Sequence, residues 1–310
     1  MNFTSPFSTG RLALLAILLA ASSALAADEL TFNSPEDALS ALKTAAQSHD
    51  TNSFHTIFGP EGCALMSADA VQATAEYNRF VERLTNKVEL VTNTDSIITL
   101  NLGRDGWPFP IPLVSKDGQW FFDTEAGKAE ILNRRIGMDE LGAIAVCNAY
   151  VQAQEEYASV DRMGDGVRAY AQYLHSTPGT QDGLFWPTNE PGTDLSPLGP
   201  LIAQARMEGY RKSATMMSEQ LAPYHGYYFK ILTRQSKHAA GGKFDYLING
   251  RMIAGFALVA WPAEWKNTGV MTFIVNQEGQ VYQKDLGPKT VKLASEMTVF
   301  DPDDTWTPAK

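Results

Sequence analysis

The sequence predicts an α+β protein made of two domains, and three observations support this prediction. In each half of the chain, segments with the helical spacing of apolar residues come first. Segments rich in β-branched and aromatic residues follow them. Short turn signals separate these later segments, which favours hairpins and antiparallel strands. We expect an N-terminal domain at residues 27–138 and a C-terminal domain at residues 139–310.

The first 26 residues have the pattern of a cleavable secretory signal peptide. Arg11 supplies a positive charge, Leu12–Ala21 is a short apolar run, and Ala24-Leu25-Ala26 is a small-residue cleavage site. The apolar run is too short for a membrane-spanning helix, which needs about 20 residues. We expect cleavage near Ala26, a periplasmic or secreted protein, and no transmembrane segment in the mature chain.

Helices begin the N-terminal domain. Ser34-Pro35-Glu36-Asp37 is typical of a helix start, because serine caps the first turn and proline fits its first position. Further helices are expected around residues 54–58 and from Ser67. Strands are then expected over residues 88–100, 108–114 and 120–122, with a hairpin turn at Lys116-Asp117-Gly118. Helices over a curved antiparallel sheet resemble the NTF2-like cone.

A long helix begins the C-terminal domain, over about Asp139 to Ser159, with one apolar face. A second helical piece is expected over Val167–Leu174 and a third near Leu201–Arg211. Residues 176–200, rich in Pro, Gly, Thr and Ser, predict an irregular loop. Strands follow, and Asn249-Gly250 is a strong hairpin signal between two of them. These strands are expected at Tyr227–Leu232, Phe244–Ile248, Met252–Trp261, Val270–Val275 and Gln280–Asp285.

Several motifs resemble a family of bacterial exported proteins known only as domain of unknown function 2950. The motifs include STPGTQDGLFWP at residues 176–187, PYHGYYFKIL at 223–232, GFALVAWPAEW at 255–265 and FDPDDTW at 300–306. The resemblance covers nearly the whole mature chain. It implies no activity, because the family is defined without one.

The C-terminal half also resembles the globular part of type IV pilins and pseudopilins. A helix ending in AYVQAQEEYAS leads to strands that contain GYYFKIL and TGVMTFIVNQEGQVY. In pilins a helix lies across a small antiparallel sheet. The chain departs from pilins because the apolar N-terminal half of the helix, through which pilins polymerise, is missing. The resemblance therefore implies a reused scaffold rather than filament assembly.

Composition excludes several classes of function. The formal net charge is −10 and no Lys/Arg cluster is present, which argues against nucleic acid and anionic lipid as partners. The signatures of serine hydrolases, phosphate-binding loops, dinucleotide-binding folds and paired zinc ligands are absent. We expect no cofactor, no metal site and no assignable catalytic residue.

Two regions combine polar and aromatic residues as binding sites do. His225 lies in the densest cluster of this kind, and a second group flanks the Gly/Pro-rich loop. Each side chain also has a purely structural explanation, in which the histidines bond to backbone and the aromatic rings pack on the sheet. The candidate binding residues are His175, Asp182, Trp186, Tyr224, His225 and Tyr227.

The chain has two cysteines, Cys63 and Cys147. They would be able to pair in an oxidising compartment, although sequence alone does not show that they approach each other. The alternative is two separate buried thiols.

Three functions remain open on the sequence. The first is a non-enzymatic binding or assembly module of the cell envelope, with a protein or glycan as its partner. The second is an exported hydrolase or carbohydrate-active enzyme that uses His225, His175 and Asp182, which requires these side chains to converge. The third is a small-ligand carrier with a cavity in the N-terminal domain.

Overall fold

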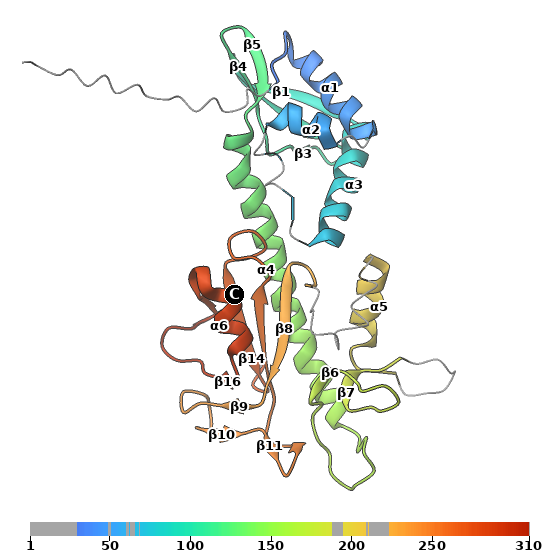
Figure 1. Cartoon of the computed structure of the whole chain (residues 1–310), viewed down its shortest axis with the longest axis vertical. Coiled ribbons are helices and arrows are strands. Elements are labelled where there is room, and N and C mark those ends of the chain that lie inside the picture. Colours follow the sequence, from blue (N-terminus) through green and yellow to red (C-terminus); the bar gives the residue numbers. More distant parts are fainter. Residues whose placement is uncertain are drawn as a thin grey trace, which may run out of the picture.

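The computed structural model describes residues 30–48, 51–59, 62, 66–67, 69–187, 195–208, 210 and 223–309. The chain forms two groups of helices and antiparallel strands joined by one long helix (Figure 1). The α+β class is therefore confirmed. Among the described helices, none combines the length and the hydropathy that a membrane crossing requires. The predicted signal peptide, residues 1–26, lies outside the described residues.

The first group contains three helices and an antiparallel sheet with strand order β1-β2-β4-β5, in which β3 pairs with β2. Ser34 caps the first helix as expected, because its Oγ accepts a hydrogen bond from Asp37 N at 3.1 Å. Asp117 and Gly118 both have positive φ and form the predicted hairpin turn. The elements are α1 (Pro35–Ser48), α2 (Thr51–Phe58), α3 (Ala70–Asn86), β1 (Val88–Thr94), β2 (Ile97–Leu102), β3 (Trp107–Pro108), β4 (Leu113–Lys116) and β5 (Gln119–Phe122).

Aromatic rings fill the core of this first group. Phe54 lies 6.3 Å from Phe80, and Phe80 stacks on Phe109 at 5.4 Å between ring centroids. Trp107 packs against Phe109 and lies beneath the guanidinium of Arg83. Phe54, Phe80 and Trp107 are the side chains that a carrier would need as cavity lining, and here they contact other side chains. The likeness to an NTF2-like cone stays a prediction.

The long helix α4 (Thr124–Ala158) connects the two groups and is the most informative difference from the expected fold. It begins 15 residues before the predicted start at Asp139, and Asp123 caps it by accepting a hydrogen bond from Ala126 N. The boundary proposed between residues 138 and 139 therefore lies inside a helix. Its buried face contains Ala143, Cys147 and Tyr150, whereas Leu141 is 65% exposed.

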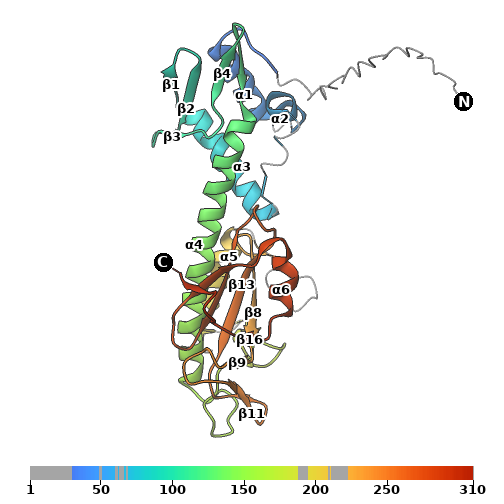
Figure 2. The ribbon, with the colours of Figure 1, turned by 90° about the vertical axis from the view of Figure 1, so that its left-hand side faces the viewer.

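The second group is a sheet with order β17-β15-β14-β13-β8, covered on one face by α4 and on the other by α6 (Figure 2). Three small sheets extend it, and a short 3-10 turn, η3, precedes α6. The remaining elements are β6 (Tyr173–His175), β7 (Gly183–Phe185), α5 (Gly199–Glu208), β8 (Tyr227–Leu232), β9 (Arg234–Gln235), β10 (Phe244–Asp245), β11 (Leu247–Ile248), β12 (Arg251–Met252), β13 (Ala257–Pro262), β14 (Met271–Asn276), β15 (Tyr282–Asp285), η3 (Gly287–Lys289), α6 (Thr290–Glu296), β16 (Val299–Phe300) and β17 (Thr307–Pro308).

Two predictions for this half need correction. The helix expected over Val167–Leu174 is absent, because Ala171 N and O both bond to the buried Gln154 side chain and Tyr170 N bonds to Met252 O. The strand expected over Met252–Trp261 is divided into β12 and β13 at Gly255. The hairpin at Asn249-Gly250 is confirmed, since both residues have positive φ between β11 and β12.

Replacing Gly255 with valine is expected to destabilise the protein by more than about 2 kcal/mol. Gly255 has φ +150°, and a Cβ there would lie 2.9 Å from ring atoms of Tyr246 and 2.8 Å from Gln277 Oε1. Urea unfolding measures the effect, and Ile253→Val at a 40% exposed neighbour is the control. An unchanged melting temperature for Gly255→Val would contradict this close packing.

Candidate functional site

His225 lies at the tip of a tight turn that the sequence encodes locally. His225 and Gly226 have φ +47° and +71°. Tyr224 and Tyr227 on either side exchange two backbone hydrogen bonds of 2.9 and 3.1 Å. This is the geometry of a two-residue hairpin turn, in which both central residues are left-handed. The turn leads directly into β8.

The imidazole of His225 pairs with Glu208 at the end of α5. Its Nε2 lies 2.8 Å from Glu208 Oε2, and both side chains are about one-third exposed. The Tyr224 ring packs edge-on against His225, with 4.3 Å between ring centroids. Burial, together with the neighbouring Glu208, raises the pKa of Tyr224 to about 12. The contact between His225 and Glu208 thus connects the end of α5 to the turn that precedes β8.

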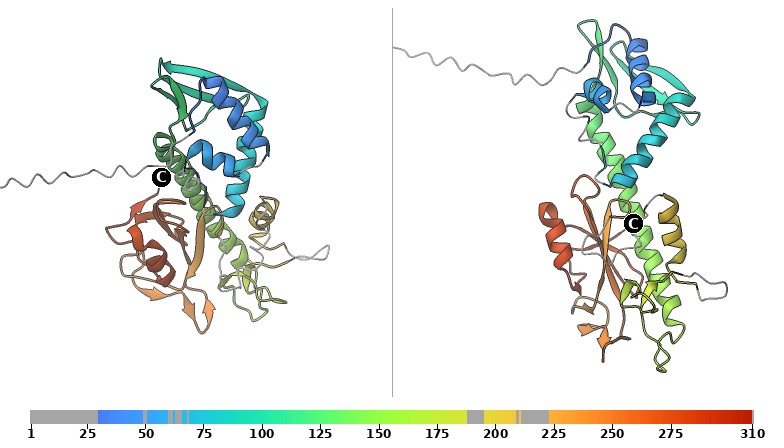
Figure 3. Two further views of the ribbon diagram at one scale, coloured as in Figure 1. Left: turned by 45° about the horizontal axis from the view of Figure 1, so that its top comes forward. Right: turned by 45° about the vertical axis from the view of Figure 1, so that its right-hand side comes forward.

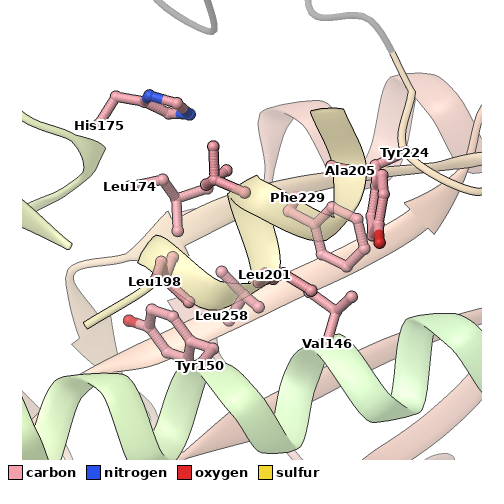
Figure 4. A pocket seen from close by; sticks show the side chains of 11 residues that line it. Val146, Tyr150, Leu174, His175, Leu198, Leu201, Ala205, Tyr224, Phe229 and Leu258 are labelled. Atoms are coloured by element: carbon pink, nitrogen blue, oxygen red, sulfur yellow. The ribbon is translucent and has the colours of Figure 1, made fainter. Parts of the chain in front are cut away.

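An apolar cavity lies beside this turn, between α4, α5, β6 and β8 (Figure 4). Two of the sequence-predicted residues, His175 and Tyr224, lie at opposite ends of its lining. Burial and the nearby Arg206 lower the pKa of His175, which favours the neutral ring. The cavity measures about 40 Å³, which is room for little more than one water molecule or methyl group.

The other predicted residues have structural roles. Asp182 accepts hydrogen bonds from Thr177 N, Thr177 Oγ1 and Thr180 Oγ1 at 2.7 to 2.8 Å and so closes its own loop. Although burial opposes its ionisation, these bonds hold the pKa of Asp182 below its usual range. Trp186 is buried beneath the guanidinium of Arg162. Tyr227 is buried in the sheet, where its hydroxyl donates to Met271 O at 2.9 Å.

His175, Asp182 and His225 do not form a catalytic constellation. Among the described residues, no hydrogen bond joins any two of them. Ser236, His238 and Asp301 lie together elsewhere, but there the aspartate contacts both the serine hydroxyl and His238 Nδ1. Activation of a serine requires the histidine between the other two groups. Neither cluster has the arrangement of a nucleophile and its base.

The outer edge of β8 is the most unusual feature near the cavity. β8 ends the five-stranded sheet and pairs with β13 on one side. On the other side, Tyr227 is bonded to Tyr224 and Thr233 O accepts from Tyr246 N at 2.8 Å. Backbone groups of alternate residues face the same side of a strand, so those of Phe229 and Ile231 also face outward. In the part of the chain that the structure describes, no backbone group pairs with them.

A buried polar cluster joins the two groups of elements close to the same turn. Asp69 caps α3 through one oxygen, while its other oxygen accepts from Tyr210 Oη at 2.7 Å and Gly226 N at 3.3 Å. Asp139 of α4 accepts a hydrogen bond from Gln72 and is 1% exposed. Burial raises the pKa of Asp139 to about 8. Arg135 Nη2 lies 3.6 Å from Glu76 Oε2, and both side chains interact electrostatically with Asp139. We name Asp69, Gln72, Glu76, Arg135 and Asp139 the junction cluster.

Comparison with known proteins identifies the family. Residues 29–309 match the family described as "Protein of unknown function (DUF2950)". The chain belongs to this family. No curated protein and no solved structure matches the chain. The expected resemblance to this family is thus confirmed, and the likeness to pilins stays a prediction.

The description of the DUF2950 family names no activity. The candidate site is therefore defined by its geometry alone. Of the candidate residues named from the sequence, His175 and Tyr224 line the cavity. The sequence did not indicate Glu208, Tyr210 or the junction cluster. One signal was present, because Asp139 shares a helical face with the apolar residues Ala143 and Cys147.

The possible pairing of Cys63 with Cys147 stays a prediction. Cys147 is fully buried in α4, and burial raises the pKa of its thiol to about 12. Cys63 lies outside the described residues. The Cys147 side chain is part of the hydrophobic core of the second group of elements.

Proposed function

We propose that this DUF2950 protein is a non-enzymatic binding module of the cell envelope that holds an extended segment of a partner protein along β8. The observation that carries this proposal is the outward-facing backbone of Phe229 and Ile231. An extended chain can complete the ladder there, as in other cases of β-strand addition. A protein segment fits this edge better than a glycan, because it supplies backbone donors and acceptors at the same spacing.

The apolar cavity supports the same function. Phe229 and Leu174 line it next to the free edge, together with Ala205 of α5. A side chain of an added strand that points inward would reach this lining, since side chains alternate along a strand. The cavity volume of about 40 Å³ is enough for the end of one small aliphatic side chain of the added strand. Pockets that hold drug-sized ligands measure roughly 300–1,000 Å³, which disfavours a substrate or carrier function for this cavity.

Site-directed crosslinking in intact cells tests the proposal. A photo-crosslinking residue at Tyr173, which is 52% exposed on β6 beside β8, is expected to capture a defined partner. The same residue at the exposed Asp95 serves as the control position. Ile231→Pro removes the outward N–H without removing a bond to β13, so it should abolish the Tyr173 crosslink. Ile231→Val keeps the N–H and should preserve it.

Two results would contradict the proposal. A Tyr173 crosslink that Ile231→Pro leaves unchanged would show that the partner does not use this edge. Turnover of a cell-wall substrate by the purified mature chain, abolished by His225→Ala, would establish the hydrolase alternative instead.

A further inference from the structure

A second, larger groove lies on the α6 face of the sheet, and none of its lining residues belongs to β8 or to the junction cluster. Its lining residues come from the end of β15, from α6 and from the segment that follows α6 towards Trp306. Figure 3 shows α6 as the red helix at the side of the lower group of elements. The volume of the groove is about 390 Å³, roughly ten times that of the cavity beside His175. The apolar part of its lining consists of Leu286, Leu293, Met297, Val299 and Trp306.

The groove has an acidic rim. Glu296, Asp301 and Asp303 contribute three carboxylates, and Lys284 contributes the single cation. Lys284 is already engaged, since its Nζ donates to Thr305 Oγ1 at 2.6 Å and lies 5.6 Å from the Trp306 ring centroid. Hydrogen bonds from Thr305 are the main reason that the pKa of Asp303 lies below its usual range. The lining residues therefore carry a net charge of about −2 at neutral pH.

The carboxylates of Asp301 and Asp303 are each oriented by hydrogen bonds to one of their two oxygens. Asp301 Oδ1 accepts from Ser236 Oγ and lies 2.7 Å from His238 Nδ1. Asp303 Oδ1 accepts from the Thr305 backbone N–H at 2.9 Å and from its hydroxyl. The Oδ2 atoms of both have no hydrogen-bond partner among the described residues. Carboxylates fixed through one oxygen are preorganised to receive a donor on the other.

The chemistry of this lining selects among ligands. The described residues include no group of three metal-ligating side chains, so the arrangement does not suit a metal ion. Repulsion by three carboxylates disfavours an anion. A sugar would stack on an open aromatic face, but Trp306 packs against the core and carries Lys284 over its ring. The negative charge of the rim and the apolar lining of the groove together fit a ligand with a basic side chain next to an apolar side chain.

We propose that this groove binds a basic peptide segment, whose guanidinium or ammonium group bridges Asp301 and Asp303. An adjacent aliphatic side chain of the same peptide packs on Leu286 and Met297. This site is separate from the β8 edge, and it gives the protein a second attachment point on the opposite part of the same sheet.

Fluorescence anisotropy with the mature chain tests this site directly. The probe is fluorescein-labelled Leu-Arg-Leu-Arg-Leu-amide, and the matched peptide Leu-Glu-Leu-Glu-Leu-amide should not bind. The double variant Asp301→Asn/Asp303→Asn is expected to weaken binding at least about tenfold, because it removes both negative charges that would receive the charge-assisted hydrogen bonds of the peptide. Asp304→Asn is the control, since Asp304 is exposed and outside the lining.

Further variants separate this proposal from loss of folding and from the β8 edge. Glu296→Lys changes an exposed rim side chain, so it should weaken binding while leaving the melting temperature unchanged. Ile231→Pro should leave the affinity for the arginine peptide unchanged. Equal affinity for both peptides, or loss of binding in Ile231→Pro alone, would overturn the assignment of the groove.

Discussion

Replacing Gly183 with alanine is expected to cost about 3 kcal/mol or more of folding free energy. Gly183 begins β7, which pairs in parallel with β6. A Cβ at this position would lie 2.5 Å from His175 C and 2.6 Å from Ser176 N. These are backbone atoms, so no side-chain rotation can relieve the overlap. Urea unfolding followed by circular dichroism measures the loss.

Gly137→Ala is the matched control for this substitution. Gly137 is in α4, and a Cβ there would meet no atom within 4 Å. Alanine at an open helical position is expected to be neutral or to stabilise by roughly 0.5–1 kcal/mol. A Gly183→Ala variant as stable as the wild type would show that β6 and β7 do not approach this closely. That result would also contradict the position of His175 beside the cavity, because His175 belongs to β6.

The stability of the protein is expected to fall as pH rises from about 4 to about 8, because of Asp139. Burial raises the pKa of Asp139 from 3.8 to about 8; Glu76 and Asp69 act in the same direction, whereas Gln72 and Arg135 oppose them. Within this window the folded state holds a proton that the unfolded chain has released. The free energy of unfolding therefore falls with rising pH, by roughly 1.4 kcal/mol per pH unit at the steepest.

Asp139→Asn tests this origin. Asparagine keeps the shape and remains neutral, so the variant should show a much shallower pH dependence and exceed the wild type in stability at pH 8. The exposed Asp95→Asn should keep the wild-type slope. Urea unfolding at pH 5, 6, 7 and 8 provides the comparison. Wild-type stability that rises across this range would contradict a protonated Asp139.

The local turns of this fold were predictable from sequence, because their chemistry is contained in two adjacent residues. Asp117-Gly118 and Asn249-Gly250 adopt the left-handed conformations that their types allow. The start of α4 was missed even though its signal is equally local, since Asp123 precedes Thr124 and Glu125 as a helix cap does. Gly127, Gly137 and the charged residues between the cap and Asp139 conceal the continuous helix.

The remaining features depend on contacts between distant residues. Asp69 bonds to Gly226, 157 residues later, and this pairing has no trace in local spacing. Helical spacing over Val167–Leu174 was misleading because Gln154 supplies the polar partners that a helix would have satisfied internally. The free edge of β8 required knowledge of the strand order, which hairpin signals alone do not determine.

The uninterrupted course of α4 has a mechanical consequence for the binding function proposed above. A helix of 35 residues, at 1.5 Å per residue, extends about 50 Å. Its first turns follow β5 and its last turns lie beneath the sheet that ends in β8. A partner held at one end would therefore stand at a set spacing from whatever contacts the other end. Shortening or lengthening α4 by whole turns is therefore expected to change this spacing.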